Sequence, residues 1–203
     1  MIRDMRNVTH IPLLLALLFL PGCAAVTAVS AVPGVLFEAV HSEFSSEEES
    51  FARNIEPTTA AVQKSLHAMN LDADVVEFRK NGYAIAFTNG KLKGDIRLEK
   101  MTPRLTTMRI KVRSRMREPS VERAIVASVR NNLTHTSGRD HFDLSDYRNL
   151  RAKPTIHTKK LGWYREDAKL PMHRKGKTDW LRMKLPSGKI AYLKSFDMNV
   201  ASK

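Results

Sequence analysis

The chain has 203 residues, with 34 Lys or Arg side chains against 21 Asp or Glu side chains, which gives a formal net charge of +13. Its single cysteine excludes a disulfide bond within the chain, and its length suits one domain of ordinary size or two small ones. The charge is uneven, because residues 1–100 carry 10 basic and 12 acidic side chains whereas residues 101–203 carry 24 and 9.

A short apolar segment follows the amino terminus. Arg3 and Arg6 provide a basic start, and the apolar run at residues 11–20 falls well short of the roughly 20 residues that a membrane span needs. A basic start, an apolar run and small residues after it are typical of a secretory signal peptide. Residues 1–22 are therefore predicted to direct export and to be removed.

The end of this segment reads Leu20-Pro21-Gly22-Cys23 and resembles the lipobox of bacterial lipoproteins. The resemblance implies that Cys23 carries lipid, including acyl chains such as palmitate, and several acyl chains hold a protein stably in a membrane. Pro21 stands where a small or β-branched residue is usual, and the alternative is an ordinary signal peptide cut near Ala24. Because Ala24 and not an aspartate follows the cysteine, the resemblance implies an outer-membrane location facing the periplasm.

The basic second half of the chain favours an anionic partner. Nucleic acid is the usual partner of so basic a chain, but export argues against it, and no nucleic acid is expected. Anionic phospholipid, lipopolysaccharide or another acidic polymer of the envelope agrees better with export. The alternative is a solvated basic surface that has no specific ligand.

After a tether at residues 23–34, residues 35–134 are predicted to form an α+β domain. The expected elements are strands at residues 51–55, 75–79, 83–88, 93–99 and 105–116 and helices at residues 57–69 and 119–133. Asn81-Gly82 is a pair typical of a tight hairpin turn, and Pro57 suits the start of a helix. The predicted fold class is therefore α+β, with two helices packed on an antiparallel sheet.

Residues 108–117 show the clearest period-two alternation in the chain. One face is apolar, and the other face carries Arg109, Lys111, Arg113, Arg115 and Arg117. One interpretation is a basic ladder that grips an anionic surface. The other is the solvent face of a half-buried sheet, on which charges discourage edge pairing.

The order of strand, helix, four strands and helix resembles an uncharacterised bacterial lipoprotein family with a small α+β domain. The segments that carry the resemblance are Phe51-Ala52-Arg53, Ala68-Met69-Asn70-Leu71, Asp95-Ile96-Arg97-Leu98-Glu99 and residues 109–113. That family has no established activity, so the resemblance implies a fold and an anchored location but no reaction.

Residues 135–154 are polar and are predicted to form a linker. Asp140, His141, Asp143 and Asp146 lie close together there, but their spacing fits no calcium loop, and no nucleophile motif surrounds them. Asp143 or Ser145 is interpreted as a helix cap instead. We expect no metal, no cofactor and no enzymatic activity; a hydrolase that uses His141 is an alternative.

Residues 155–198 are predicted to form a small all-β, barrel-like domain, because short apolar strands alternate with turn residues. The run at residues 179–193 resembles the end of bacterial Src-homology-3-like (SH3-like) domains, in which a Trp strand, a turn with Gly and a closing aromatic strand recur. That family contacts peptidoglycan or peptides, although its usual Asn-x-Arg-Ser-Gly-Pro stretch is missing from this chain. The aromatic residues expected to line a groove, or else to fill a small core, are Trp163, Tyr164, Trp180 and Tyr192.

The sequence thus predicts a lipid-anchored protein of the bacterial cell envelope with a non-catalytic binding or scaffolding role. Its expected contacts are the membrane through Cys23, and peptidoglycan or envelope proteins through the aromatic residues. The alternative is a protein that binds anionic lipid or lipopolysaccharide through the basic strand face, for which the expected residues are Arg109, Lys111, Arg113 and Arg115.

Overall fold

The computed structural model describes residues 46–174 and 179–195. Cys23, the predicted signal peptide and the predicted tether lie outside the described residues, as does the predicted turn at residues 175–177. The described residues belong to one compact unit. None of the helices in this part of the chain is both long and apolar enough to cross a bilayer.

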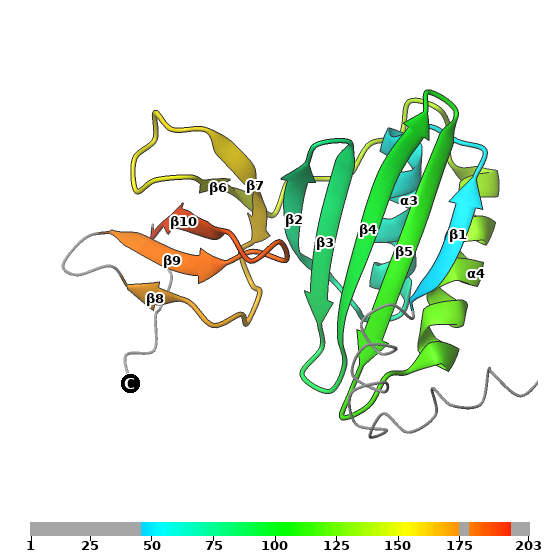
Figure 1. The fold of residues 1–203 in the computed structure, drawn as a ribbon, viewed down its shortest axis with the longest axis horizontal. Coiled ribbons are helices and arrows are strands. Elements are labelled where there is room, and N and C mark those ends of the chain that lie inside the picture. Colours follow the sequence, from blue (N-terminus) through cyan, green and yellow to red (C-terminus); the bar gives the residue numbers. More distant parts are fainter. Residues whose placement is uncertain (1–45, 175–178, 196–203) are drawn as a thin grey trace, which may run out of the picture. The chain divides into compact units, whose positions relative to one another are not determined.

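The described residues form one open antiparallel sheet of ten strands, accompanied by two helices (Figure 1). The strands are β1 (Glu47–Phe51), β2 (Ala73–Arg79), β3 (Gly82–Thr88), β4 (Lys93–Thr102), β5 (Leu105–Arg113), β6 (Tyr147–Arg151), β7 (Lys160–Arg165), β8 (His173–Arg174), β9 (Trp180–Lys184) and β10 (Ile190–Lys194). The helices are α3 (Ile55–Ala68) and α4 (Pro119–His135). The strand order is β1-β5-β4-β3-β2-β7-β6-β10-β9-β8.

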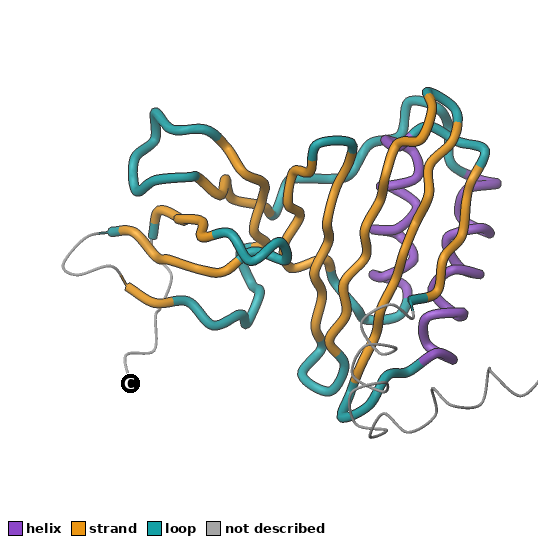
Figure 2. The backbone as a smooth tube through the Cα atoms, in the orientation of Figure 1, coloured by secondary structure: helices purple, strands orange, loops and turns teal. Residues whose placement is uncertain are grey.

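The two helices contact each other and one face of the strands at the β1 end of the sheet (Figure 2). Period-two alternation directs Ile85, Ile96 and Ile110 to this face, where they pack against Leu66 of α3 and Val129 of α4. All five side chains are fully buried. Because both helices pack on this face, the opposite face of the same strands is not covered by a helix.

Helix α4 is fixed to β5 at its first turn. Pro119 stands at its first helical position, which suits a residue that lacks a backbone N–H. The buried carboxylate of Glu122 accepts hydrogen bonds from the Val112 backbone N–H at 2.9 Å and from Arg117 Nε at 3.0 Å. This charge is therefore both paired and hydrogen-bonded, as burial requires.

A second core lies on the other side of β2. Neighbouring residues Val75 and Val76 are both buried but belong to different cores, because successive strand residues face opposite sides. Val75 packs with Tyr164 and Leu181 of the carboxy-terminal strands. The junction is a true ladder, in which Val75 lies opposite Tyr164 and Val76 opposite Trp163.

The predicted fold class is wrong. The prediction was an α+β fold with two helices packed on a sheet, followed by a separate barrel-like domain. The described residues instead form a mostly β structure, in which the carboxy-terminal strands continue the same open ten-stranded sheet. The physical reason is that the second edge of β2 pairs with β7, while Val75 and Val76 bury the two faces of β2 in different cores, so the carboxy-terminal strands extend the sheet instead of forming a domain of their own.

Individual elements agree better with the predictions. The β2–β3 hairpin with its turn at Asn81-Gly82 and the helix beginning at Pro119 are confirmed. The predicted strand at residues 51–55 is wrong, because β1 ends at Phe51 and α3 begins at Ile55. Strand β6 was missed, since it lies within the predicted linker at residues 135–154.

Candidate functional site

The predicted basic ladder on β5 is partly neutralised by neighbouring strands. Arg109 Nε donates to Glu48 of β1 at 2.8 Å, and Arg109 Nη1 lies 3.5 Å from a carboxylate oxygen of Glu99 on β4. The hydrogen bond and charge of Glu48 raise the pKa of Arg109. Lys111 lies opposite Asp95 in the ladder. These two positions therefore sit on a face of mixed charge.

The other three ladder residues, Arg113, Arg115 and Arg117, lie in different environments and do not form one surface. Arg113 ends β5 and is exposed, whereas Arg115 follows in an exposed bend outside the strand. Arg117 turns inward, and its guanidinium donates to both carboxylate oxygens of Glu122 at 3.0 and 3.1 Å. The predicted strand at residues 105–116 is thus too long, and Met116 is 79% exposed where the alternation predicted a core position.

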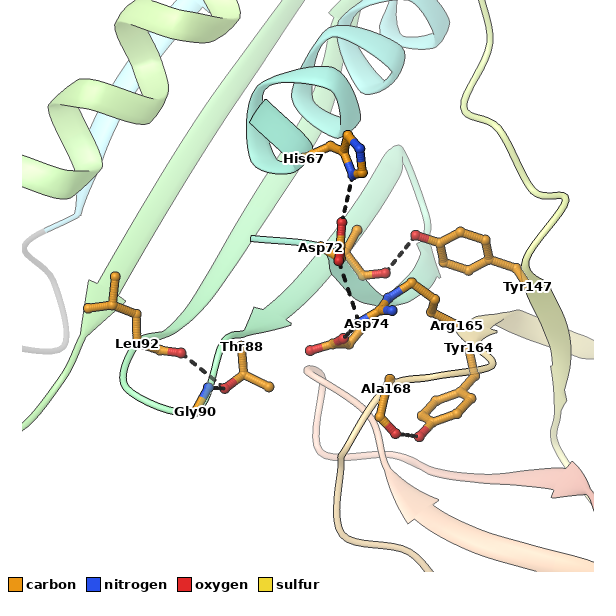
Figure 3. Close-up of polar contacts among 11 residues, drawn as sticks. His67, Asp72, Asp74, Thr88, Gly90, Leu92, Tyr147, Tyr164, Arg165 and Ala168 are labelled. Atoms are coloured by element: carbon orange, nitrogen blue, oxygen red, sulfur yellow. Dashed lines mark hydrogen bonds and ion pairs between the residues drawn. The ribbon is translucent and has the colours of Figure 1, made fainter. Parts of the chain in front are cut away.

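The four aromatic residues that were predicted to line a groove do not all lie at one surface. Tyr164 is fully buried, and its hydroxyl donates to the Ala168 carbonyl oxygen (Figure 3). A side chain without exposed surface cannot contact a ligand at the surface. Trp180 and Tyr192 are half-buried on β9 and β10, whereas Trp163 is half-buried on β7, where its ring lies 4.5 Å from that of Phe78.

A cleft of about 620 Å³ opens on the sheet face that no helix covers, and we call it the sheet cleft. Its exposed apolar surface comes from the half-buried Ala86, Leu170 and Pro186, whereas Val75, Ala84 and Leu185 also line it but are buried. Its size is within the range of small-molecule sites. The small side chains of Ala84 and Ala86 leave room above the strands.

Cationic side chains surround this apolar surface. They are Arg79, Lys93, Arg97, Arg113 and Lys184, and Asp95 is the one carboxylate among the lining residues. All five cationic residues are exposed. Among the described residues, no carboxylate forms an ion pair with Lys93, Arg113 or Lys184. An anion can therefore pair with these three side chains without first breaking an ion pair within the protein.

The β9–β10 turn that walls the sheet cleft is held by a buried carboxylate. Glu77 of β2 is 1% exposed and accepts a hydrogen bond from the Ser187 backbone N–H at 2.9 Å. Arg79 Nη1 lies 3.4 Å from the same carboxylate. The wall and the strand floor are thus joined through one side chain.

A second polar contact joins the two parts of the sheet at β2 and β7 (Figure 3). Arg165 Nη2 lies 2.8 Å from the buried Asp74 carboxylate, and Asp72 Oδ2 lies 3.9 Å from the same nitrogen. Burial raises the pKa of Asp74, while the hydrogen bond and charge of Arg165 work in the opposite direction. Removal of Arg165 would leave the buried Asp74 carboxylate uncompensated, so the pair favours one alignment of β2 and β7.

The acidic segment before β6 forms exposed turns. Asp140 accepts hydrogen bonds from Ser137 and from Lys64 at 3.2 Å, and these bonds lower the pKa of Asp140. The Asp143 carboxylate accepts a hydrogen bond from the Ser145 backbone N–H at 2.9 Å in a loop before β6. No helix begins at either residue, so the predicted helix cap at Asp143 or Ser145 is wrong. Within residues 46–174 and 179–195, no three His, Asp or Glu side chains are arranged to hold a metal ion.

The sequence identified Arg113 but missed the other cations of the sheet cleft. Lys93 and Arg97 alternate with the apolar residues of β4, and this signal could have placed them on the same solvent face as the ladder. Lys184 was missed because its approach to that face depends on the pairing of β7 with β2, which has no signal in either strand alone.

Comparison of the chain with protein-family models gives no match, and no curated protein matches it. The resemblances to a bacterial lipoprotein family and to SH3-like domains therefore stay predictions.

Proposed function

We propose that the protein is a lipid-anchored, non-catalytic binding protein of the bacterial cell envelope, and that its sheet cleft binds an anionic lipid. The observation that carries this proposal is the combination of five cationic side chains with an apolar floor in one cleft. A lipid with an anionic headgroup offers matching chemistry, because its phosphate pairs with guanidinium and ammonium groups while its apolar part covers the half-buried Ala86, Leu170 and Pro186.

The anchor and the cleft support each other functionally. A chain attached to a membrane through Cys23 meets lipid at a high effective concentration, so a cleft of modest intrinsic affinity is occupied. The lipobox resemblance motivates the anchor and the outer-membrane location, and export is the reason that nucleic acid is not proposed as the partner of the basic surface.

Contact with peptidoglycan or envelope proteins has weaker support. That role requires several exposed aromatic side chains near one another, whereas Tyr164 is fully buried and Trp163 and Trp180 lie on different strands. Neither of these tryptophans lines the sheet cleft. The cleft therefore favours the anionic-lipid role, with Arg113 retained from the predicted ladder.

Short-chain lipids test the proposal directly, because they are soluble and probe the cleft without a membrane surface. We expect the purified full chain, in a neutral detergent, to bind dihexanoyl phosphatidylglycerol more tightly than dihexanoyl phosphatidylcholine in calorimetric titrations. Added salt is expected to weaken this preference. Lys93→Glu and Arg113→Glu should each raise the dissociation constant for the anionic lipid about tenfold, since each replaces an attraction with a repulsion.

Arg104→Glu is the matched control. It makes the same charge change on an exposed residue in the β4–β5 turn, at the opposite end of the ladder from Lys93 and Arg113 and outside the lining of the sheet cleft. Its dissociation constant is expected to stay within about twofold of the wild-type value, as for a distant surface charge. Equal affinity of the wild type for the two lipids, or equal losses in the Arg113 and Arg104 variants, would contradict the proposal.

A further inference from the structure

A second cleft, of about 770 Å³, lies beside the β2–β3 turn, and we call it the hairpin cleft. Its lining includes the aromatic side chains of Phe78 and Tyr83, which occupy paired positions on β2 and β3. Phe78 is 36% exposed although it is a large apolar residue. An exposed phenyl ring in the wall of a cleft is a surface on which a ligand ring can pack.

Two other rings hold Phe78 in place. The ring centroid of Trp163 lies 4.5 Å from that of Phe78, with a tilt of 55°, and the centroid of Tyr83 lies 6.1 Å away. Tilted aromatic pairs at these separations are favourable. The exposed ring is thus supported from two strands and needs little ordering when a ligand binds.

The hairpin cleft is strongly cationic. Its basic lining residues are Arg79, Lys80, Arg97, Lys159, Lys160 and Lys189, against one carboxylate, that of Glu99. Glu99 already lies 3.5 Å from Arg109. Among the residues that the structure describes, no carboxylate forms an ion pair with Lys80, Lys159 or Lys189.

Lys160 places a positive charge beside the aromatic group. Its Nζ lies 4.3 Å from the Trp163 ring centroid and 6.0 Å from that of Phe78. Burial, with a contribution from the charge of Arg151, lowers the pKa of Lys160. A bound anion would compensate this ammonium group, which has only ring faces as partners in the described structure.

The hairpin cleft and the sheet cleft share three lining residues. Arg79, Arg97 and Ser187 line both clefts. A phosphate held at these two guanidinium groups can therefore reach both the half-buried Ala86 and Leu170 of the sheet cleft and the Phe78 ring of the hairpin cleft.

We infer that the hairpin cleft binds a phosphorylated sugar, so that the lipid of the sheet cleft is one with a phosphosugar headgroup. Sugar rings have apolar C–H faces that pack on aromatic rings, while Asn81 and Glu99 offer polar groups to the hydroxyls. The guanidinium groups of Arg79 and Arg97 and the ammonium group of Lys160 pair with the phosphate. This inference about the lipid rests on the proposed function, whereas the sugar site itself stands on the hairpin cleft alone.

Three soluble probes test the site by calorimetry on the purified full chain in neutral detergent: glucose 6-phosphate, inorganic phosphate and glucose. The wild type is expected to bind glucose 6-phosphate about tenfold more tightly than either other probe. Phe78→Ala should abolish this preference, because phosphate binding survives without the ring. Lys160→Gln should weaken glucose 6-phosphate and inorganic phosphate by the same factor, because it removes a charge and leaves the ring.

Phe78→Leu keeps most of the apolar volume but has no flat ring, and it replaces Phe78→Ala in the test if that variant fails to fold. It should also lose the preference for glucose 6-phosphate. Met101→Ala is the control, since Met101 is an exposed apolar residue that lines neither cleft. A wild type that binds inorganic phosphate as tightly as glucose 6-phosphate overturns the sugar site, as does a Phe78→Leu variant that keeps the preference.

The two proposals fail in different ways. Loss of the sugar preference together with retained Arg113-dependent binding of phosphatidylglycerol removes only the sugar site. A sugar preference that depends on Phe78, without any selectivity for anionic lipid, supports the sugar site and removes the lipid function.

Discussion

At the residue scale, Glu77 is a buried acid whose position is explained by two donors. Its carboxylate lies on the same face of β2 as Val75 and receives the Ser187 N–H, while Arg79 approaches from the strand end. A buried carboxylate without such partners would be strongly unfavourable. Glu77 therefore acts on the sheet cleft indirectly, as a positioning residue for the turn at Ser187.

Replacement of Glu77 tests its contribution to stability and to lipid binding. Glu77→Ala is expected to lower the free energy of unfolding by about 1–3 kcal/mol, because the donors lose a hydrogen-bond partner in a partly buried place. It should also weaken binding of dihexanoyl phosphatidylglycerol, because the Ser187 turn is no longer fixed. Glu48→Ala, at a half-exposed carboxylate paired with Arg109, should cost no more than about 1 kcal/mol in the same denaturant titration. Equal losses in the two variants would show that Glu77 has no special structural role.

Residue-scale prediction from the sequence succeeded where the partner is local and failed where it is distant. Period-two alternation placed Arg113 on a solvent face, where the structure also has it. The same alternation did not reveal that Glu48 neutralises Arg109, because β1 lies far from β5 along the chain. Burial of Tyr164 was equally hidden, since it depends on the pairing of β7 with β2.

At the scale of elements, the junction of β2 and β7 requires a residue without a side chain. A Cβ atom added to Gly162 of β7 would lie 2.1 Å from the Val76 carbonyl oxygen and 2.9 Å from the Glu77 Cα. Both are backbone atoms, so they cannot move aside as a flexible side chain would. Gly162 thus permits the close approach on which the continuous sheet depends.

Gly162→Ala is therefore expected to destabilise the protein by about 1–3 kcal/mol, as overpacked substitutions do. Gly138→Ala is the matched control, because a Cβ atom there has no neighbour within 4 Å. Its effect on the unfolding free energy should stay within about 0.5 kcal/mol. Thermal or urea unfolding measures both variants, and a Gly162 variant as stable as the control would contradict this account of the junction.

Elements with strong local signals were predictable, and those defined by pairing were not. The β2–β3 hairpin follows from Asn81-Gly82 between apolar runs, and α4 follows from Pro119 before a helical period. Strand β6 has the sequence YRNLR, of which Leu150 alone is buried, so its alternation carries almost no information. It is a strand because β7 and β10 lie on either side of it.

At the scale of the whole described unit, one strand determines both the fold and the candidate site. Because β2 is buried on both faces, the helices pack on one side and the carboxy-terminal strands on the other. Composition and element order suggested two separate domains of the α+β and barrel classes, since neither contains information about the β2–β7 ladder. That ladder brings Lys184 and Leu185 to the strands that carry Lys93 and Arg113, and so creates the sheet cleft.

Native mass spectrometry of the full chain, purified from bacterial membranes in a neutral detergent, tests the central claim most directly. It reports the covalent mass of the mature chain and any lipid that remains bound. We predict a lipid-modified chain beginning at Cys23 that retains an anionic lipid, and a Lys93→Glu plus Arg113→Glu variant with the same covalent mass but without the bound lipid. A wild type without anionic lipid, or a variant that retains it equally, would contradict the account.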